Sequence, residues 1–163
     1  IKIPFYLLPV PMTMQTFVVL LLGISFGYKI GSATVILYLM EGIIGLPVFS
    51  NSPEKGVGLV YFTGPTMGYL VGFILAVFLI GYLKLHDWTK KGAKSVKFFF
   101  INLIKLIISV STIYILGLIW LSNLIGFEKA LIFGLKPFWA AELFKITLLA
   151  FLIPFILKFR KFI

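Results

Sequence analysis

Five apolar spans, separated by short breaks, account for most of this chain and constrain its fold more than any other feature. They run over about residues 13–26, 32–44, 65–83, 96–121 and 137–157. At a helical rise of about 1.5 Å per residue, the first two cover only about 20 Å of a bilayer core that is about 30 Å thick. We therefore expect a bundle of membrane-spanning helices, in which the two short spans are tilted, extended into their loops or partly buried in protein.

The composition agrees with a location in lipid. Hydrophobic residues make up 61% of the 163 residues and the mean hydropathy is +1.12, which is more apolar surface than a soluble domain of this size can hide. The net charge of +10 does not indicate a nucleic-acid partner, because the lysines cluster beside the apolar spans. With no cysteine and one histidine, disulfides and thiolate metal sites are excluded, and we expect neither a metal nor a cofactor.

The basic residues assign the two sides of the membrane. Alternate breaks hold nine of them, namely Lys29, Lys84, Lys90, Lys91, Lys94, Lys97, Lys158, Arg160 and Lys161, whereas the other breaks hold four, namely Lys2, Lys55, Lys129 and Lys136. The positive-inside rule makes the richer set cytoplasmic, which places the C-terminus inside and the 45–63 loop outside. Because the chain begins without methionine in a proline-rich stretch, we expect one further helix before it. The prediction is a single all-α transmembrane domain of about six helices, the first missing here.

Two charged residues lie inside the fifth span, where charges are expensive and normally face the interior of a bundle. Glu142 and Lys145 are three residues apart, so both side chains lie on one helical face and can pair. An internal ion pair, or a lysine that reaches the outer interface, is the structural explanation. We favour a functional one, in which the pair presents donors and an acceptor to a polar solute.

A second polar face runs along the fourth span. Asn102, Lys105, Ser109 and Thr112 are spaced three, four and three residues apart. We expect Asn102, Ser109 and Thr112 to form hydrogen bonds between helices, and Lys105 to extend toward the cytoplasmic surface.

The segment Gly64-Pro65-Thr66 ends one element and starts the third span, because proline fits the first turn of a helix. Gly64, Gly68 and Gly72 then recur every fourth residue, leaving a bare stripe that another helix or a ligand can approach closely. Two outer loops, 9–15 and 45–50, are too apolar to be solvated connectors. We expect them to fold back over a pocket.

Five segments follow one another in a characteristic order and spacing: Pro9-Val10-Pro11-Met12-Thr13-Met14-Gln15-Thr16, Leu37-Tyr38-Leu39, Gly42-Ile43-Ile44-Gly45-Leu46-Pro47-Val48-Phe49, Gly64-Pro65-Thr66-Met67-Gly68-Tyr69-Leu70-Val71-Gly72-Phe73 and Glu142-Leu143-Phe144-Lys145. Together they resemble the BioY family of biotin transporters, the substrate-binding S components of energy-coupling-factor transporters.

The resemblance implies a six-helix bundle in the plasma membrane, with a biotin pocket near the outer face beneath the two loops. It implies that Glu142 accepts hydrogen bonds from the ureido N–H groups of biotin and that Lys145 donates to one of its oxygens. Further pocket residues are expected at Gln15, Tyr38, Phe49, Gly64, Thr66 and Tyr69. A transmembrane coupling subunit and ATP-binding subunits are the implied partners, since the chain has no nucleotide-binding loop of its own.

Two alternatives remain at this stage. The family usually has aspartate at the position of Glu142, so another vitamin could be the ligand. Gly23-Ile24-Ser25-Phe26-Gly27 also fits the Gly-x-Ser-x-Gly pattern of serine hydrolases, with His86 in a break on the same side. However, glycines at 23, 27 and 31 are equally explained by helix packing.

Overall fold

The computed structural model describes residues 2–3, 12–50, 52, 56–87 and 96–160, with side chains over 13–50, 52, 56–83 and 96–158. Several features discussed above lie outside the described residues: Pro9-Val10-Pro11, Lys55, Lys90, Lys91, Lys94, Lys161 and the side chains of Lys2, Lys84, His86 and Arg160.

Helices make up almost all of the described structure. Their bounds are α1 Gln15–Ile43, α2 Leu59–Phe62, α3 Met67–Asp87, α4 Val96–Ile125, α5 Phe127–Gly134 and α6 Trp139–Arg160, and a short antiparallel pair joins β1 Lys2–Ile3 to β2 Met12–Thr13. Three of the helices, α1, α4 and α6, are long and apolar enough to cross a membrane, and α3 contributes a shorter apolar stretch. The all-α membrane fold expected from the sequence is confirmed.

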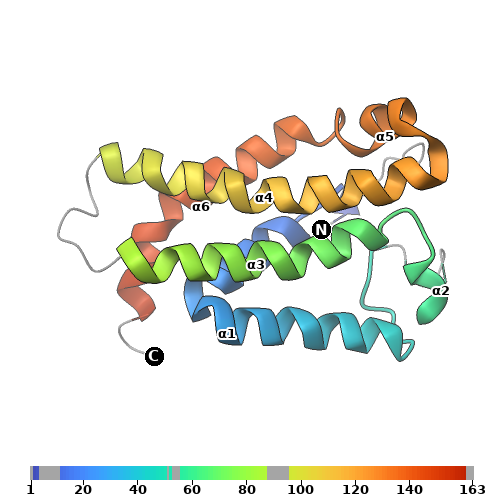
Figure 1. Ribbon diagram of the computed structural model, residues 1–163. Helices are drawn as coiled ribbons and strands as arrows, with labels where there is room; N and C mark the ends of the chain where they lie inside the picture. The colour runs from blue at the N-terminus through green and yellow to red at the C-terminus, as the bar shows by residue number, and fades with distance from the viewer. Residues whose placement is uncertain (1, 4–11, 51, 53–55, 88–95, 161–163) are drawn as a thin grey trace.

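The first two spans are the arms of a hairpin within α1. Gly27, at φ 79°, is non-helical and divides the helix. The amide nitrogen of the Gln15 side chain lies 2.6 Å from the hydroxyl of Tyr38, 23 residues further on, whereas a straight helix of that length would separate them by about 35 Å. The first arm therefore runs away from the end where the chain enters, and the second runs back beside it (Figure 1).

Glycines hold the bundle together through close backbone contacts. A Cβ atom at Gly72 would lie 2.7 Å from the Cα of Ile113, and one at Gly68 would meet the Leu116 carbonyl of α4. A Cβ at Gly81 would meet Gly27 and Tyr28 at the turn of α1. The glycine stripe of α3 is thus a packing surface against α4. The sequence left open whether a helix or a ligand approaches this stripe, and in the structure it is a helix.

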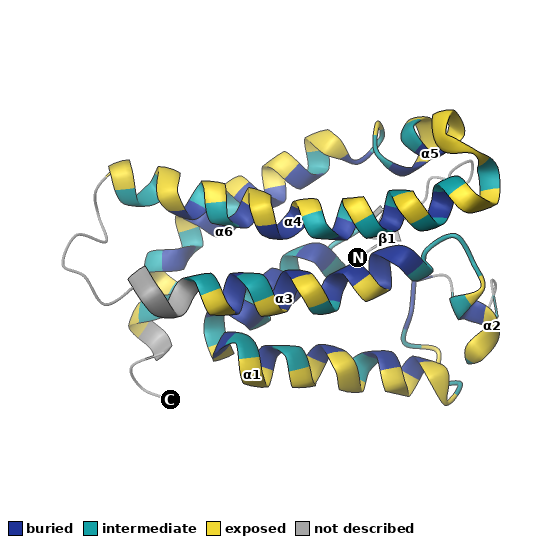
Figure 2. Cartoon of the chain, viewed as in Figure 1, coloured by how far each residue is buried: buried dark blue, intermediate teal, exposed yellow. Residues whose placement is uncertain are grey.

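The core lies between α3 and its neighbours, and includes Ile24, Val77, Leu106 and Leu149, each fully buried. Large apolar side chains such as Ile30, Ile104, Phe151 and Phe155 are exposed on the outside, where Figure 2 shows yellow along the outer faces of the long helices. An apolar exterior of this extent is what a lipid environment requires.

The polar face of α4 differs from the expectation. The Ser109 hydroxyl donates to the Lys105 carbonyl at 2.9 Å and the Thr112 hydroxyl to the Ser109 carbonyl at 2.8 Å, so both bonds stay within α4. The prediction of bonds between helices is therefore wrong for these two residues, because a helical hydroxyl can reach a carbonyl one turn back in its own helix. Lys105 does cross between helices, since its Nζ lies 3.4 Å from the Leu83 carbonyl of α3.

Candidate functional site

The predicted charged pair is present, and its hydrogen bonds join the start of α6 to the start of α1. The Nζ of Lys145 lies 2.7 Å from the Oε1 of Glu142, and both residues are buried, at 5% and 6% exposed. The Thr16 hydroxyl of α1 donates to the same carboxylate oxygen at 2.9 Å. Residues 126 positions apart in the chain therefore meet in one polar cluster.

Lys145 and Glu142 differ in how much hydrogen-bonding capacity they leave for a ligand. Lys145 also donates to the Thr13 carbonyl and to the Thr16 hydroxyl, so all three of its N–H bonds have acceptors. The second oxygen of Glu142, Oε2, is buried and accepts no hydrogen bond from a described residue, although the Tyr114 hydroxyl of the same cavity is close enough to interact with the carboxylate. A buried carboxylate oxygen without a donor is unfavourable, so the cluster offers an acceptor to any ligand that brings an N–H or O–H group.

This cluster lines a small cavity of about 60 Å³ at the end of the bundle. Besides the charged pair and Thr16, its wall includes Tyr61, Thr66, Tyr69, Leu70, Phe73, Ile113, Tyr114 and Phe138, with Thr13 and Gln15 at its edge. Five helices, α1, α2, α3, α4 and α6, and the strand that precedes α1 thus contribute to the wall.

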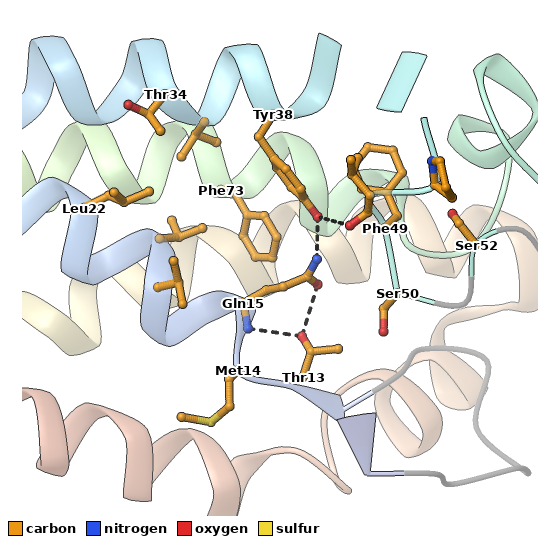
Figure 3. A pocket seen from close by; sticks show the side chains of 15 residues that line it. Thr13, Met14, Gln15, Leu22, Thr34, Tyr38, Phe49, Ser50, Ser52 and Phe73 are labelled. Atoms are coloured by element: carbon orange, nitrogen blue, oxygen red, sulfur yellow. Dashed lines mark hydrogen bonds between the residues drawn. The ribbon is translucent and has the colours of Figure 1, made fainter. Parts of the chain in front are cut away.

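A much larger cavity of about 620 Å³ adjoins the small one, and Thr13, Gln15 and Phe73 line both. It lies between the two arms of α1 and beneath the loop that follows them. Figure 3 shows Gln15 and Tyr38 reaching toward each other across it, joined by a hydrogen bond of 2.6 Å. The Thr13 hydroxyl donates to the side-chain amide oxygen of Gln15, Oε1, at 3.1 Å, and the Tyr38 hydroxyl donates to the Val48 backbone carbonyl at 3.3 Å. The volume falls within the range of about 300–1,000 Å³ that is usual for small-molecule sites.

Phe49 anchors the 45–50 loop over this cavity. Its ring, only 4% exposed, stacks on Tyr61 with centroids 4.8 Å apart and meets Tyr38 edge-on at 5.3 Å. Any Cβ at Gly42 would collide with the Phe49 ring, so that glycine allows the ring to lie on the backbone of α1. Gly45, at φ 99°, makes the turn that brings the loop back. The fold-back expected for this apolar loop is present.

Tyr61 fixes the next part of the same loop. Its hydroxyl donates to the Ser50 carbonyl at 2.7 Å. Burial raises the pKa of Tyr61, so the phenol stays protonated and remains a donor in neutral solution.

The remaining predicted residues come from the start of α3. Thr66 and Tyr69 both line the small cavity, although the Tyr69 hydroxyl donates to the Gly134 carbonyl at 3.0 Å. Gly64 lies outside both cavity linings, and its carbonyl accepts a hydrogen bond of 2.9 Å from Trp120. Its contribution is to shape the turn between α2 and α3.

Sequence reasoning passed over eight residues that line the small cavity, and four of them show why. Thr13 and Thr16 flank Gln15 in the same motif, and their polar side chains beside a charged pair were the available signal. Tyr114 and Phe73 lie within uniformly apolar spans, where nothing in the pattern separates a cavity wall from ordinary packing.

Comparison with known proteins gives a consistent result. The family model of the BioY family matches residues 1–162. The chain is 34% identical to a probable biotin transporter BioY of Pyrococcus horikoshii, covering 84% of this chain and 74% of that protein. It is 37% identical to the biotin transporter BioY of Thermotoga maritima, covering 87% and 78%. It also resembles the crystal structure of the S component for biotin from an ECF-type ABC transporter, with a TM-score of 0.80, 28% identity, and coverage of 96% of this chain and 80% of that one.

Proposed function

The chain belongs to the BioY family, and from this premise we propose that it binds biotin in the two adjoining cavities as the specificity subunit of a vitamin transporter. Membership of a family of transporter components makes it a multi-pass membrane protein and not an enzyme. The glycines of the Gly-x-Ser-x-Gly segment have structural roles, since a Cβ at Gly23 would lie 2.7 Å from the Val77 carbonyl and Gly27, at φ 79°, makes the turn of α1.

The observation that supports biotin most strongly is the free oxygen of Glu142. The ureido group of biotin carries two N–H donors on one edge, and a buried carboxylate oxygen without a partner is their natural complement. Lys145 and Thr16 both bind Oε1, so they hold the carboxylate in place and leave Oε2 for the ligand. In this proposal Lys145 positions Glu142, and its contact with a biotin oxygen requires release of the Thr13 carbonyl.

Uptake against a gradient needs an energy source that the chain does not supply. We propose that a transmembrane coupling subunit and ATP-binding subunits provide it, because the similar solved structure is the S component of an ECF-type ABC transporter. The cavity end is then the outer end, the turn at Gly27 is cytoplasmic, and the protein lies in the plasma membrane with its C-terminus inside. The break in α1, the start of α4 and the end of α6 lie at the end of the bundle away from α2 (Figure 1), and Lys29, Lys97 and Lys158 are next to these points in the sequence, which supports this orientation.

Calorimetric titration of the purified protein with biotin and a panel of other vitamins tests the proposal. We expect saturable binding of biotin and no heat from vitamins without a ureido group. Binding of a different vitamin, with none of biotin, would assign the same fold to another ligand.

A further inference from the structure

Two serine side chains in the large cavity have hydrogen-bonding capacity that the function proposed above does not use. Ser50 and Ser52 lie in the loop between α1 and α2, and both line the large cavity (Figure 3). The Oγ atoms of both are buried and have no hydrogen-bond partner among the described residues, and Ser50 is only 8% exposed. Buried hydroxyls are normally hydrogen-bonded, so the pair is suited to a ligand.

The other polar side chains around this cavity are already engaged. Gln15 uses its amide nitrogen on Tyr38 and its carbonyl oxygen on Thr13. Tyr38 in turn donates to the Val48 carbonyl. Gln15 keeps one further amide N–H, whereas the two serine hydroxyls make no hydrogen bond at all with a described residue, which leaves both fully available to a ligand.

Tyr61 connects the serine loop to the cavity that contains Glu142. This residue lines the small cavity with Glu142, and its hydroxyl holds the Ser50 carbonyl at 2.7 Å. Ser50 therefore lies where the two cavities adjoin. A ligand with one end at Glu142 Oε2 and a chain that passes Gln15 enters the large cavity, which the two serines line.

We propose that Ser50 and Ser52 bind the end of the biotin tail, and that they accept an uncharged end as well as a carboxylate. The inference rests on the proposed function, because it takes the ureido ring to lie at Glu142. A serine hydroxyl donates to a carboxylate oxygen and equally accepts from an amide N–H. Among the described residues that line the large cavity, none carries a charge. Because these hydroxyls can serve either kind of end group, the proposed substrate class extends to biotin amides, such as biotin joined through its tail to an amine.

The test is a set of titrations of the whole protein with three ligands: biotin, biotinamide, and an analogue in which a methyl group replaces the carboxyl group. The proteins are the parent, Ser50→Ala, Ser52→Ala and the matched control Ser122→Ala. Ser122 lies at the same end of the bundle but lines neither cavity, and its hydroxyl bonds the Ile119 carbonyl.

We expect Ser50→Ala and Ser52→Ala each to weaken biotin binding about tenfold, as loss of one hydrogen bond to a charged group does. Both should leave the methyl-ended analogue and the Ser122→Ala control near the parent affinity. Biotinamide should bind the parent within about tenfold of biotin, since the hydroxyls are neutral.

Three results overturn the inference. Unchanged biotin affinity in both serine variants would place the tail elsewhere. Equal losses for biotin and the methyl-ended analogue would mean that the serines support the loop and do not contact the tail. A loss of more than tenfold for biotinamide would show that a cation binds the tail. If the parent protein binds no biotin, both the proposed function and this inference fail. If the parent binds biotin tightly and any of the three results is found, only this inference fails.

Discussion

Two polar clusters lie among the apolar helices, and they use the same residue types in opposite ways. In the cluster around Glu142 and Lys145, hydrogen bonds join α6 to α1 and to the strand before it, across 126 to 132 positions of the chain. In α4, Ser109 and Thr112 bond carbonyls three or four positions back in their own helix. The first cluster joins two distant segments of the chain, whereas the hydrogen bonds of the second stay within one helix.

The difference shows how to recognise a site among membrane helices. The first cluster is buried and the second partly buried, but only the first lines a cavity and keeps an acceptor, Glu142 Oε2, that receives no hydrogen bond from a described residue. Asn102 of α4 also has a buried amide nitrogen without a partner among the described residues, yet it lines neither cavity. A free hydrogen-bonding group marks a ligand site when space for the ligand adjoins it.

The largest expected effect separates the two clusters directly. Glu142→Gln or Lys145→Met breaks a buried ion pair and leaves one partner uncompensated, so biotin binding should weaken by about 2–5 kcal/mol. Ser109→Ala is the control, because its hydroxyl serves only its own helix. Calorimetry on all three variants checks this. Parent-like affinity in both charge variants would make the pair purely structural.

The glycine contacts of α3 should affect stability and not ligand choice. Gly68→Ala and Gly81→Ala both push a methyl group into a neighbouring backbone, and each should destabilise the fold by about 1–3 kcal/mol. Thermal unfolding in detergent measures the effect, with the exposed Ala33→Val as the control. If Gly68→Ala instead lowers the affinity for biotin and leaves the unfolding midpoint unchanged, the glycine stripe is part of the binding site.

A smaller loss is expected from the hydrogen-bond network of the large cavity. Tyr38→Phe removes the acceptor of the Gln15 amide and the donor to the Val48 carbonyl, and should weaken biotin binding by about 1 kcal/mol. Competition binding against a labelled biotin is sensitive enough to detect this. Tighter binding than in the parent would mean that the network blocks the site and must open for the ligand.

The smallest effects belong to the polar face of α4. Thr112→Val should change stability by less than about 0.5 kcal/mol, because its bond to the Ser109 carbonyl leaves the backbone ladder intact. Unfolding measurements on this variant check the value. A large loss there would show that α4 uses its hydroxyl groups between helices after all.

Much of the fold could be predicted because lipid imposes long apolar spans, and glycine and proline punctuate them. The break at Gly27, the turn at Gly64 and the pair at Glu142 and Lys145 all follow from local pattern. The short helix α5, Phe127–Gly134, was not predicted, since a break between spans has no periodicity long enough to reveal it.

The parts of the site that escaped prediction depend on tertiary contacts. Thr16 could not be paired with Glu142 from sequence, because the two meet only after α1 folds back and packs against α6. The direction of the Ser109 hydroxyl was likewise undecidable, because a serine on a polar helical face can bond to its own helix or to a neighbour.

The central claim is that biotin lies with its ureido edge on Glu142. The thioether sulfur of biotin offers a direct probe, since the chain has no cysteine and four methionines. A crystal of the biotin complex, measured at long wavelength, should show an anomalous sulfur peak inside the cavities where Gln15 and Phe73 line both, with the ureido N–H groups facing Glu142 Oε2. A biotin sulfur located outside both cavities, or a ureido group turned away from Glu142, would contradict the account.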